Sequence, residues 1–214
     1  MNLSDQTPSN SDLFLGFDPG GDKRFGVASI VGSKVSFGTV GSIKAAKDWA
    51  IEASNGIAPY AVGIDTILHW ATGQGGFRQA DKWLKEKYPN ASRSVMAPNS
   101  LYGAMTIGGV GLAIELKRLW PNLILNETHP KVLFQALSEQ PYPRENLLSA
   151  IEWLTARTKF DLHKNRPSED EFDAILSAWA TREAVNQRWN DLVVTDNQHI
   201  YPISNVHYFW PKLN

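Results

Sequence analysis

The sequence predicts an α/β protein, in which helices cover a sheet of short strands. Short apolar segments separated by glycine-containing turns open the chain, and helical patterns alternate with further strand-like segments after them. Three of the strand-like segments run directly into an acidic residue: Asp18, Asp65 and Glu127. Helices that alternate with strands pack on the faces of the sheet that those strands form. The 214 residues suit one domain.

The first three strands are expected to form an antiparallel meander. Their turns are short and contain Gly20, Gly21 and Gly32, and short glycine turns join antiparallel neighbours. The predicted strands are 13–17, 25–31 and 34–40.

Helices and strands then alternate to the end of the chain. The predicted helices are 43–53, 78–88, 99–120, one from about Pro130, 143–158 and 168–188, and the predicted strands are 60–65 and 123–130. Four glycines between positions 103 and 111 weaken the first half of helix 99–120, because an interior Gly costs about 1 kcal/mol relative to Ala. We expect a loop or a tight helix contact there. Residues 191–211 predict a short hairpin and an aromatic tail.

The domain organisation is expected to be simple. Residues 1–12 are polar and lack the pattern of a signal peptide, which predicts a flexible N-terminal tail. Residues 13–214 are expected to form a single domain with a helical insertion around 66–120.

Composition excludes several functional classes. The chain has no cysteine, so disulfides and thiolate zinc sites are excluded, and it has no apolar run near the roughly 20 residues that span a bilayer. We expect a cytoplasmic protein without a membrane partner. The net charge is −1, so a polyanion must be held by a local patch or a bound cation. Eight Trp residues suit either an aromatic core or a homodimer interface.

The acids that end strands predict a metal site. Ligands bind at the carboxyl ends of parallel strands, where Asp18, Asp65 and Glu127 are expected to gather. Carboxylates at close range repel one another unless a cation neutralises them. A site whose ligands are all oxygen atoms, without His or Cys, suits Mg2+ or Mn2+ rather than zinc.

A fourth acid comes from the last predicted helix. Ser168 and Glu171 have the spacing of a capping box, which accounts for the acids of the first turn. Asp173 lies beyond that turn and begins a row of small residues at helical spacing, which lets the helix lie close on a sheet. Asp170, one turn earlier, is the next candidate ligand. The row consists of Asp173, Ser177, Ala180 and Ala184.

Each acid also has a structural explanation when it is taken alone. Asp18 suits an Asp-Pro-Gly turn, Asp65 suits a cap, and Glu127 suits a position before a helix. His129 likewise suits either a helix entry or a proton-transfer role. The repeated pattern of a strand followed by an acid, together with Asp173, favours the metal site.

Several motifs together resemble a known family. "LGFDPGGDKRFGVASI" is similar to the opening hairpin of the ribonuclease H-like superfamily, especially its Holliday-junction resolvase branch. "VGIDTILHW", "GGFRQADKWL", "NETHPKVLF", "DEFDAILSAWA" and "HYFWP" follow in order. Together they resemble the predicted RNase H-like nucleases grouped as domain of unknown function 429.

The resemblance implies a fold and an activity. The implied fold has a five-stranded mixed sheet, antiparallel in its first three strands, with helices on both faces. Asp18, Asp65, Glu127 and Asp173 would hold two divalent metal ions in a nuclease that hydrolyses phosphodiesters of DNA or RNA. Arg78 and Asp81 match an Arg-x-x-Asp of the family, as a structural ion pair or a phosphate contact.

Basic residues near these motifs are candidates for substrate binding, because Lys and Arg hold phosphate backbones. For Lys23, Arg24, Lys164 and Arg166, a solvated basic loop is at least as good an explanation. The candidates are Lys23, Arg24, Arg78, Lys164 and Arg166.

Two other functions fit the sequence. One is a non-catalytic protein of the same fold that binds nucleic acid or a nucleotide. The other is a phosphotransferase of the actin-like fold, although the chain is short for the duplicated domain and "ATGQGGF" lacks the Gly-Lys-Ser/Thr of a P-loop.

Overall fold

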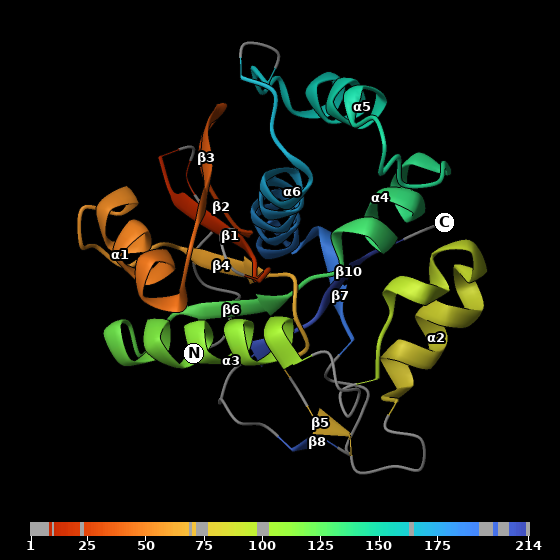
Figure 1. The fold of residues 1–214 in the computed structure, drawn as a ribbon, viewed down its shortest axis with the longest axis horizontal. Helices are drawn as coiled ribbons and strands as arrows, with labels where there is room; N and C mark the ends of the chain where they lie inside the picture. The colour runs from red at the N-terminus through yellow and green to blue at the C-terminus, as the bar shows by residue number, and fades with distance from the viewer. Residues whose placement is uncertain are drawn as a thin grey trace.

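The computed structural model shows one mixed six-stranded sheet with helices on both faces (Figure 1). It describes residues 9, 11–21, 24–68, 70–71, 77–97, 103–162, 165–192, 199–200 and 206–212. Across the sheet, the strands are β3 (Lys34–Val40), β2 (Phe25–Val31), β1 (Leu13–Asp18), β4 (Ala61–Ile64), β6 (Ile124–Glu127) and β9 (Val206–His207).

The pairing of these strands follows the predicted meander. β1, β2 and β3 are antiparallel neighbours, whereas β4 pairs parallel to β1 and β6 pairs parallel to β4. The five predicted strands are therefore confirmed. The expected total of five is wrong, because β9 adds a sixth strand parallel to β6. With two residues, β9 is too short to produce a recognisable pattern.

The predicted helices are present with shifted boundaries. α5 begins at Leu148 rather than near 143, and α3 is continuous through its glycines. The helices are α1 (Ile43–Ala53), α2 (Gln79–Lys87), the 3-10 helix η1 (Pro89–Ser94), α3 (Gly103–Leu119), α4 (Pro130–Ser138), α5 (Leu148–Thr158), α6 (Glu169–Glu183) and the π-helix η2 (Ala184–Arg188).

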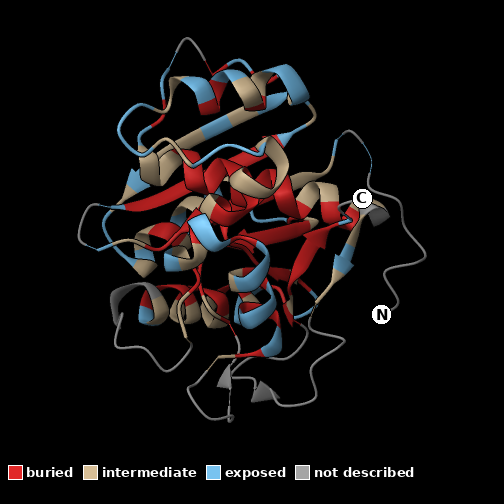
Figure 2. Cartoon of the chain, turned by 90° about the vertical axis from the view of Figure 1, so that its right-hand side faces the viewer, coloured by how far each residue is buried: buried red, intermediate tan, exposed pale blue. Residues whose placement is uncertain are grey.

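Two apolar layers lie on opposite faces of the sheet. Because side chains alternate along a strand, Phe14 packs in the layer that contains α6, whereas Leu15 and Phe17 pack in the layer that contains α1 and α3. Figure 2 shows the buried residues concentrated in the strands and in the helix that crosses them. Among the described residues, the sheet is therefore covered on both faces by apolar layers.

Glycines in the strands let α6 lie directly on the sheet. A Cβ at Gly16 would meet the carbonyl oxygen of Ala174 at 1.9 Å, and one at Gly63 would meet that of Ser177 at 2.3 Å. Glycine inside a strand often marks such a close approach of another backbone. The predicted tight contact of α3 is also present, since a Cβ at Gly109 would lie 2.3 Å from Thr66.

The C-terminal segment differs from the expected local hairpin. β7 (Trp189–Asp191) pairs antiparallel with β10 (Phe209–Pro211), and the backbone of β5 (Trp70–Ala71) pairs with β8 (His199–Ile200). The last residues thus return to the sheet and to the 66–120 segment.

Some predictions fall on residues that the structure does not describe. These are most of the N-terminal tail, namely residues 1–8 and 10, and the candidate substrate contacts Lys23 and Lys164. Among the helices of the described ranges, none has the length and apolar character needed to cross a membrane.

Candidate metal centre

Strand register places Asp18 and Asp65 side by side. Phe17 of β1 is paired with Ile64 of β4, and the backbone amide of Asp65 donates to the carbonyl of Phe17 at 2.9 Å. Asp18 and Asp65 therefore occupy equivalent positions at the carboxyl ends of two parallel strands. Both side chains lie on the face of the sheet that α6 covers.

Asp173 completes the group from α6. One carboxylate oxygen from each of Asp18, Asp65 and Asp173 lies within 4.8 Å of the others. The three residues are 6%, 9% and 0% exposed, respectively. The sequence prediction that Asp173 faces the strand ends is confirmed, and the strand glycines explain how α6 comes near enough.

Burial makes ionisation of these three acids unfavourable. Burial, and then the charges of Asp65 and Asp173, raise the pKa of Asp18 well above its usual range. Burial raises the pKa of Asp65 to about 7, although His129 opposes the shift. Burial also raises the pKa of Asp173, against the effect of Lys131. An added cation would relieve this repulsion.

Two side chains already bind Asp173. The Lys131 ammonium donates to Oδ2 at 2.5 Å, and the Tyr142 hydroxyl donates to Oδ1 at 2.6 Å. Lys131 also contacts Glu169 at 3.0 Å. These contacts hold Asp173 in one orientation and place one positive charge beside the three aspartates.

The charges and donors of this group fit a divalent cation. When ionised, the three aspartates carry −3, and Lys131, which is shared with Glu169, offsets at most one unit. The remaining negative charge suits one divalent cation such as Mg2+ or Mn2+. The donors are carboxylate oxygens, which such hard cations prefer. The residues that would hold the ion are Asp18, Asp65 and Asp173.

Glu127 does not join the three aspartates, which corrects the expected group of four acids. Ile64 is paired with Glu127, so the position equivalent to Asp65 on β6 is Thr128. Thr128 shares a hydrogen bond of 2.8 Å with Ser177 of α6. Because side chains alternate between faces, Glu127 points to the opposite face, the one that contains Leu125.

Arg78 holds Glu127 in a second, separate acidic group with Asp81 and His129. Its guanidinium contacts Glu127 at 2.5 Å and Asp81 at 2.7 Å. At 2% exposure, Arg78 has little surface for substrate. Of the two roles predicted for Arg78, a structural ion pair or a phosphate contact, the structure shows the ion pair, and Arg78 forms it with two carboxylates.

His129 brings this second group close to charge balance. Nε2 of His129 lies 3.4 Å from Oε1 of Glu127. Burial lowers the pKa of His129, but the contact with Glu127 and the charges of Asp65 and Asp81 together outweigh burial, so the pKa is raised. Arg78 and a protonated His129 together offset the charges of Asp81 and Glu127. The uncompensated charge thus lies with the three aspartates.

The other predicted contacts are distributed as follows. Asp170 accepts two hydrogen bonds from Arg24, at 3.1 and 3.2 Å, so this candidate ligand and this candidate substrate contact bind each other. Arg166 is exposed before α6. Neither Asp170 nor Arg24 belongs to the group of three aspartates.

Sequence reasoning missed Lys131 and Tyr142. Lys131 lies in the first turn of α4, where the helix dipole disfavours a positive charge. A lysine at such a position indicates that an acidic side chain lies nearby to offset its charge. Tyr142 lies between helices in "QPYPRE", where no pattern indicates its contact with Asp173.

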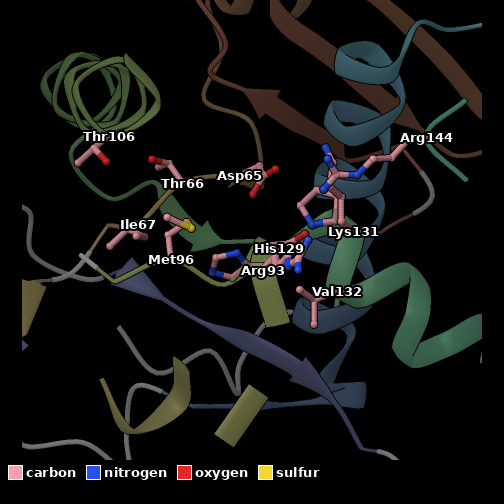
Figure 3. Close-up of a pocket in the computed structure, with 12 residues that line it drawn as sticks. Asp65, Thr66, Ile67, Arg93, Met96, Thr106, His129, Lys131, Val132 and Arg144 are labelled. Carbon is pink, nitrogen blue, oxygen red and sulfur yellow. The ribbon is translucent and has the colours of Figure 1, made fainter. Parts of the chain in front are cut away.

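A pocket adjoins the three aspartates (Figure 3). Its volume is about 490 Å³, and Asp65 and Lys131 belong both to its wall and to the aspartate site. Arg93 and Arg144 add further positive charge. A small ligand in this pocket would lie directly beside the candidate metal centre.

Comparison of the chain with protein-family models, curated proteins and solved structures finds no match.

Proposed function

We propose that the protein is a metal-dependent nuclease that hydrolyses phosphodiester bonds of nucleic acid. The observation that carries the proposal is the convergence of Asp18, Asp65 and Asp173 at the ends of β1 and β4, with a charge that Lys131 only partly offsets. The RNase H-like fold implied by the resemblance is part of the proposal. The antiparallel β1, β2 and β3 support it.

The chain's own residues would position the reactants. Asp18, Asp65 and Asp173 would hold one divalent ion, while Lys131 and Tyr142 orient Asp173. Bound Mg2+ or Mn2+ would supply a water of lowered pKa and would polarise the phosphate. The expected second ion stays a prediction, because Glu127 is bound to Arg78.

A cleavage assay tests the activity. Purified protein with Mg2+ or Mn2+ is incubated with labelled single-stranded, duplex and branched DNA and RNA. We expect cleavage of at least one substrate and its loss in EDTA. Asp18→Asn and Asp173→Asn should each reduce the rate by at least about 100-fold, since even the partners of metal ligands are worth 10–100-fold.

Asp48→Asn is the matched control, because Asp48 is an exposed aspartate paired with Lys44 on α1. It should cleave like the unaltered protein. If no substrate is cut, or if Asp18→Asn and Asp173→Asn cut normally, the nuclease proposal fails. Metal-dependent binding without cleavage would favour the non-catalytic alternative.

A further inference from the structure

The pocket beside the three aspartates has the size of a small-molecule site. Its volume of about 490 Å³ lies within the roughly 300–1,000 Å³ of ligand pockets. Asp65 lines it directly, and Lys131, which binds Asp173, lies in the same wall. A group bound here would therefore extend away from the proposed reaction centre.

The pocket has two chemically different sides. In Figure 3, Ile67, Met96 and Thr106 lie on one side, Lys131 and Arg144 lie on the other, and Asp65 lies between them. The first side offers apolar surface and a hydroxyl group, which suit a sugar and a base. The second side offers positive charge, which suits a phosphate.

Two arginines of the pocket have no acidic partner among the residues that the structure describes. Arg93 and Arg144 are exposed pocket residues, and neither forms an ion pair within the described ranges. The other arginines around the site are occupied, Arg24 by Asp170 and Arg78 by Glu127. A guanidinium suits phosphate oxygens because it can donate two parallel hydrogen bonds.

The amino end of α4 meets the same side of the pocket. Pro130 is the first helical residue, and the first hydrogen bond across the turn runs from the amide of Leu133 to the carbonyl of His129 at 2.8 Å. The amides of Lys131 and Val132 therefore have no acceptor within the helix. Free amides and the helix dipole favour a bound anion.

From these observations we infer that the pocket binds one unpaired nucleotide of the substrate. Its phosphate would lie against Arg93, Arg144 and the amino end of α4, and its sugar and base would lie against Ile67 and Met96. This inference rests on the proposed function, because it takes the three aspartates as the reaction centre. It narrows the substrate to single strands, chain ends or extruded bases, because a nucleotide within a base pair cannot enter a pocket of this size.

Binding of adenosine 5′-monophosphate to the full chain tests the inference, measured by calorimetry with Mg2+ and again in EDTA. This probe has no phosphodiester, so cleavage cannot obscure binding. We expect it to bind more tightly than either orthophosphate or adenosine. Arg93→Ala and Arg144→Ala should each weaken its binding about 10-fold, since a hydrogen bond to a charged group is worth about 1.5–3 kcal/mol.

Arg118→Ala is the matched control. Arg118 is exposed, pairs with Glu115 and lies twelve residues beyond Thr106 on α3, which is about 18 Å along the helix axis. It should leave binding unchanged. Met96→Ala should weaken binding of the monophosphate and leave that of orthophosphate unchanged. The inference is overturned if the monophosphate binds no better than orthophosphate, or if Arg93→Ala and Arg144→Ala bind normally.

Competition distinguishes unpaired from paired nucleotides. A single-stranded hexanucleotide should displace the monophosphate, and a blunt duplex of the same sequence should displace it at least about 10-fold less well, since unpairing costs a few kcal/mol. Equal displacement would overturn the narrowing to unpaired substrate. Nucleotide binding without any cleavage would refute the proposed nuclease activity but would support the inference that the pocket binds a nucleotide. Cleavage with normal KM in both arginine variants would refute the pocket alone.

Discussion

Arg78 is the residue on which the second acidic group depends. It lies buried between Asp81 and Glu127 and offsets part of the charge of both. Removing one partner of a buried ion pair leaves a charge without compensation, which is costlier than losing the pair as a whole. Glu127 is therefore expected to matter for stability, and Asp18 for metal binding.

Variants at these positions separate the two roles. Arg78→Ala should lower the free energy of unfolding by about 3–5 kcal/mol, measured by urea denaturation, whereas Arg118→Ala should change it by less than about 0.5 kcal/mol.

Glu127→Gln should also destabilise the fold but leave Mg2+ affinity close to that of the unaltered protein. Asp18→Asn should abolish Mg2+ binding. Loss of Mg2+ binding in a stably folded Glu127→Gln variant would instead identify Glu127 as a ligand.

At the scale of elements, the contact between α6 and the strands positions the site. α6 contributes Asp173, and its approach depends on Gly16 and Gly63, where a Cβ would collide with its backbone. A side chain at Gly16 would push the helix outward. The same displacement would move Asp173 away from Asp18 and Asp65.

Substitution of two strand glycines tests this contact. Gly16→Ala should lower the free energy of unfolding by at least about 1–3 kcal/mol, the usual cost of overpacking, and should weaken Mg2+ binding. Gly38→Ala on β3 is the control, because its Cβ would lie 4.0 Å from the nearest atom outside its chain neighbours, and its stability should be unchanged or slightly higher. Denaturation and Mg2+ titration measure both effects. Equal stability of the two variants would contradict the packing argument.

At the scale of the whole molecule, a nearly neutral protein contains a local excess of buried negative charge. The net charge is −1, while the aspartate site alone holds about two uncompensated charges when ionised. Raised pKa values in the fold mean that the native state binds more protons than the unfolded chain, so stability falls as pH rises.

Metal-free protein should therefore be more stable at pH 5 than at pH 8. An unfolded Asp has a pKa of about 3.9, and that of Asp65 in the fold is about 7, so stability is lost as pH rises between these values. The expected difference is on the order of a few kcal/mol, measured by urea unfolding in EDTA. Asp65→Asn should reduce the pH dependence and Asp48→Asn should retain it.

Saturating Mg2+ should shrink the difference, because the ion binds the ionised carboxylates of the folded state. Equal or greater stability at pH 8 in EDTA would show that the aspartates ionise without penalty in the fold.

Sequence patterns predicted much of the fold because most elements here are locally encoded. The limits of α1 and β2 match the predicted ranges, and Asp18, Asp65 and Asp173 meet as expected. The grouping of Glu127 failed because an acid at a strand end has no defined face until the register with the next strand is known. The contact between Arg24 and Asp170 joins residues 146 positions apart, which no local pattern indicates.

The sequence by itself determined most elements and the strand-end acids, because these depend on local spacing and side-chain size. Of the small residues predicted to face the sheet, Ser177 lies against Gly63, whereas Ala174 and Ala178 rather than Ala180 and Ala184 lie against Gly16. Only the tertiary structure decided which acids share a site. The register between β1 and β4 places Asp65 beside Asp18. The register between β4 and β6 pairs Glu127 with Ile64, one residue before Asp65, so Glu127 points to the other face and binds Arg78. The tertiary structure also brings Lys131, Arg93 and Arg144 together around one pocket, because contacts between distant segments form only when the sheet and helices are assembled.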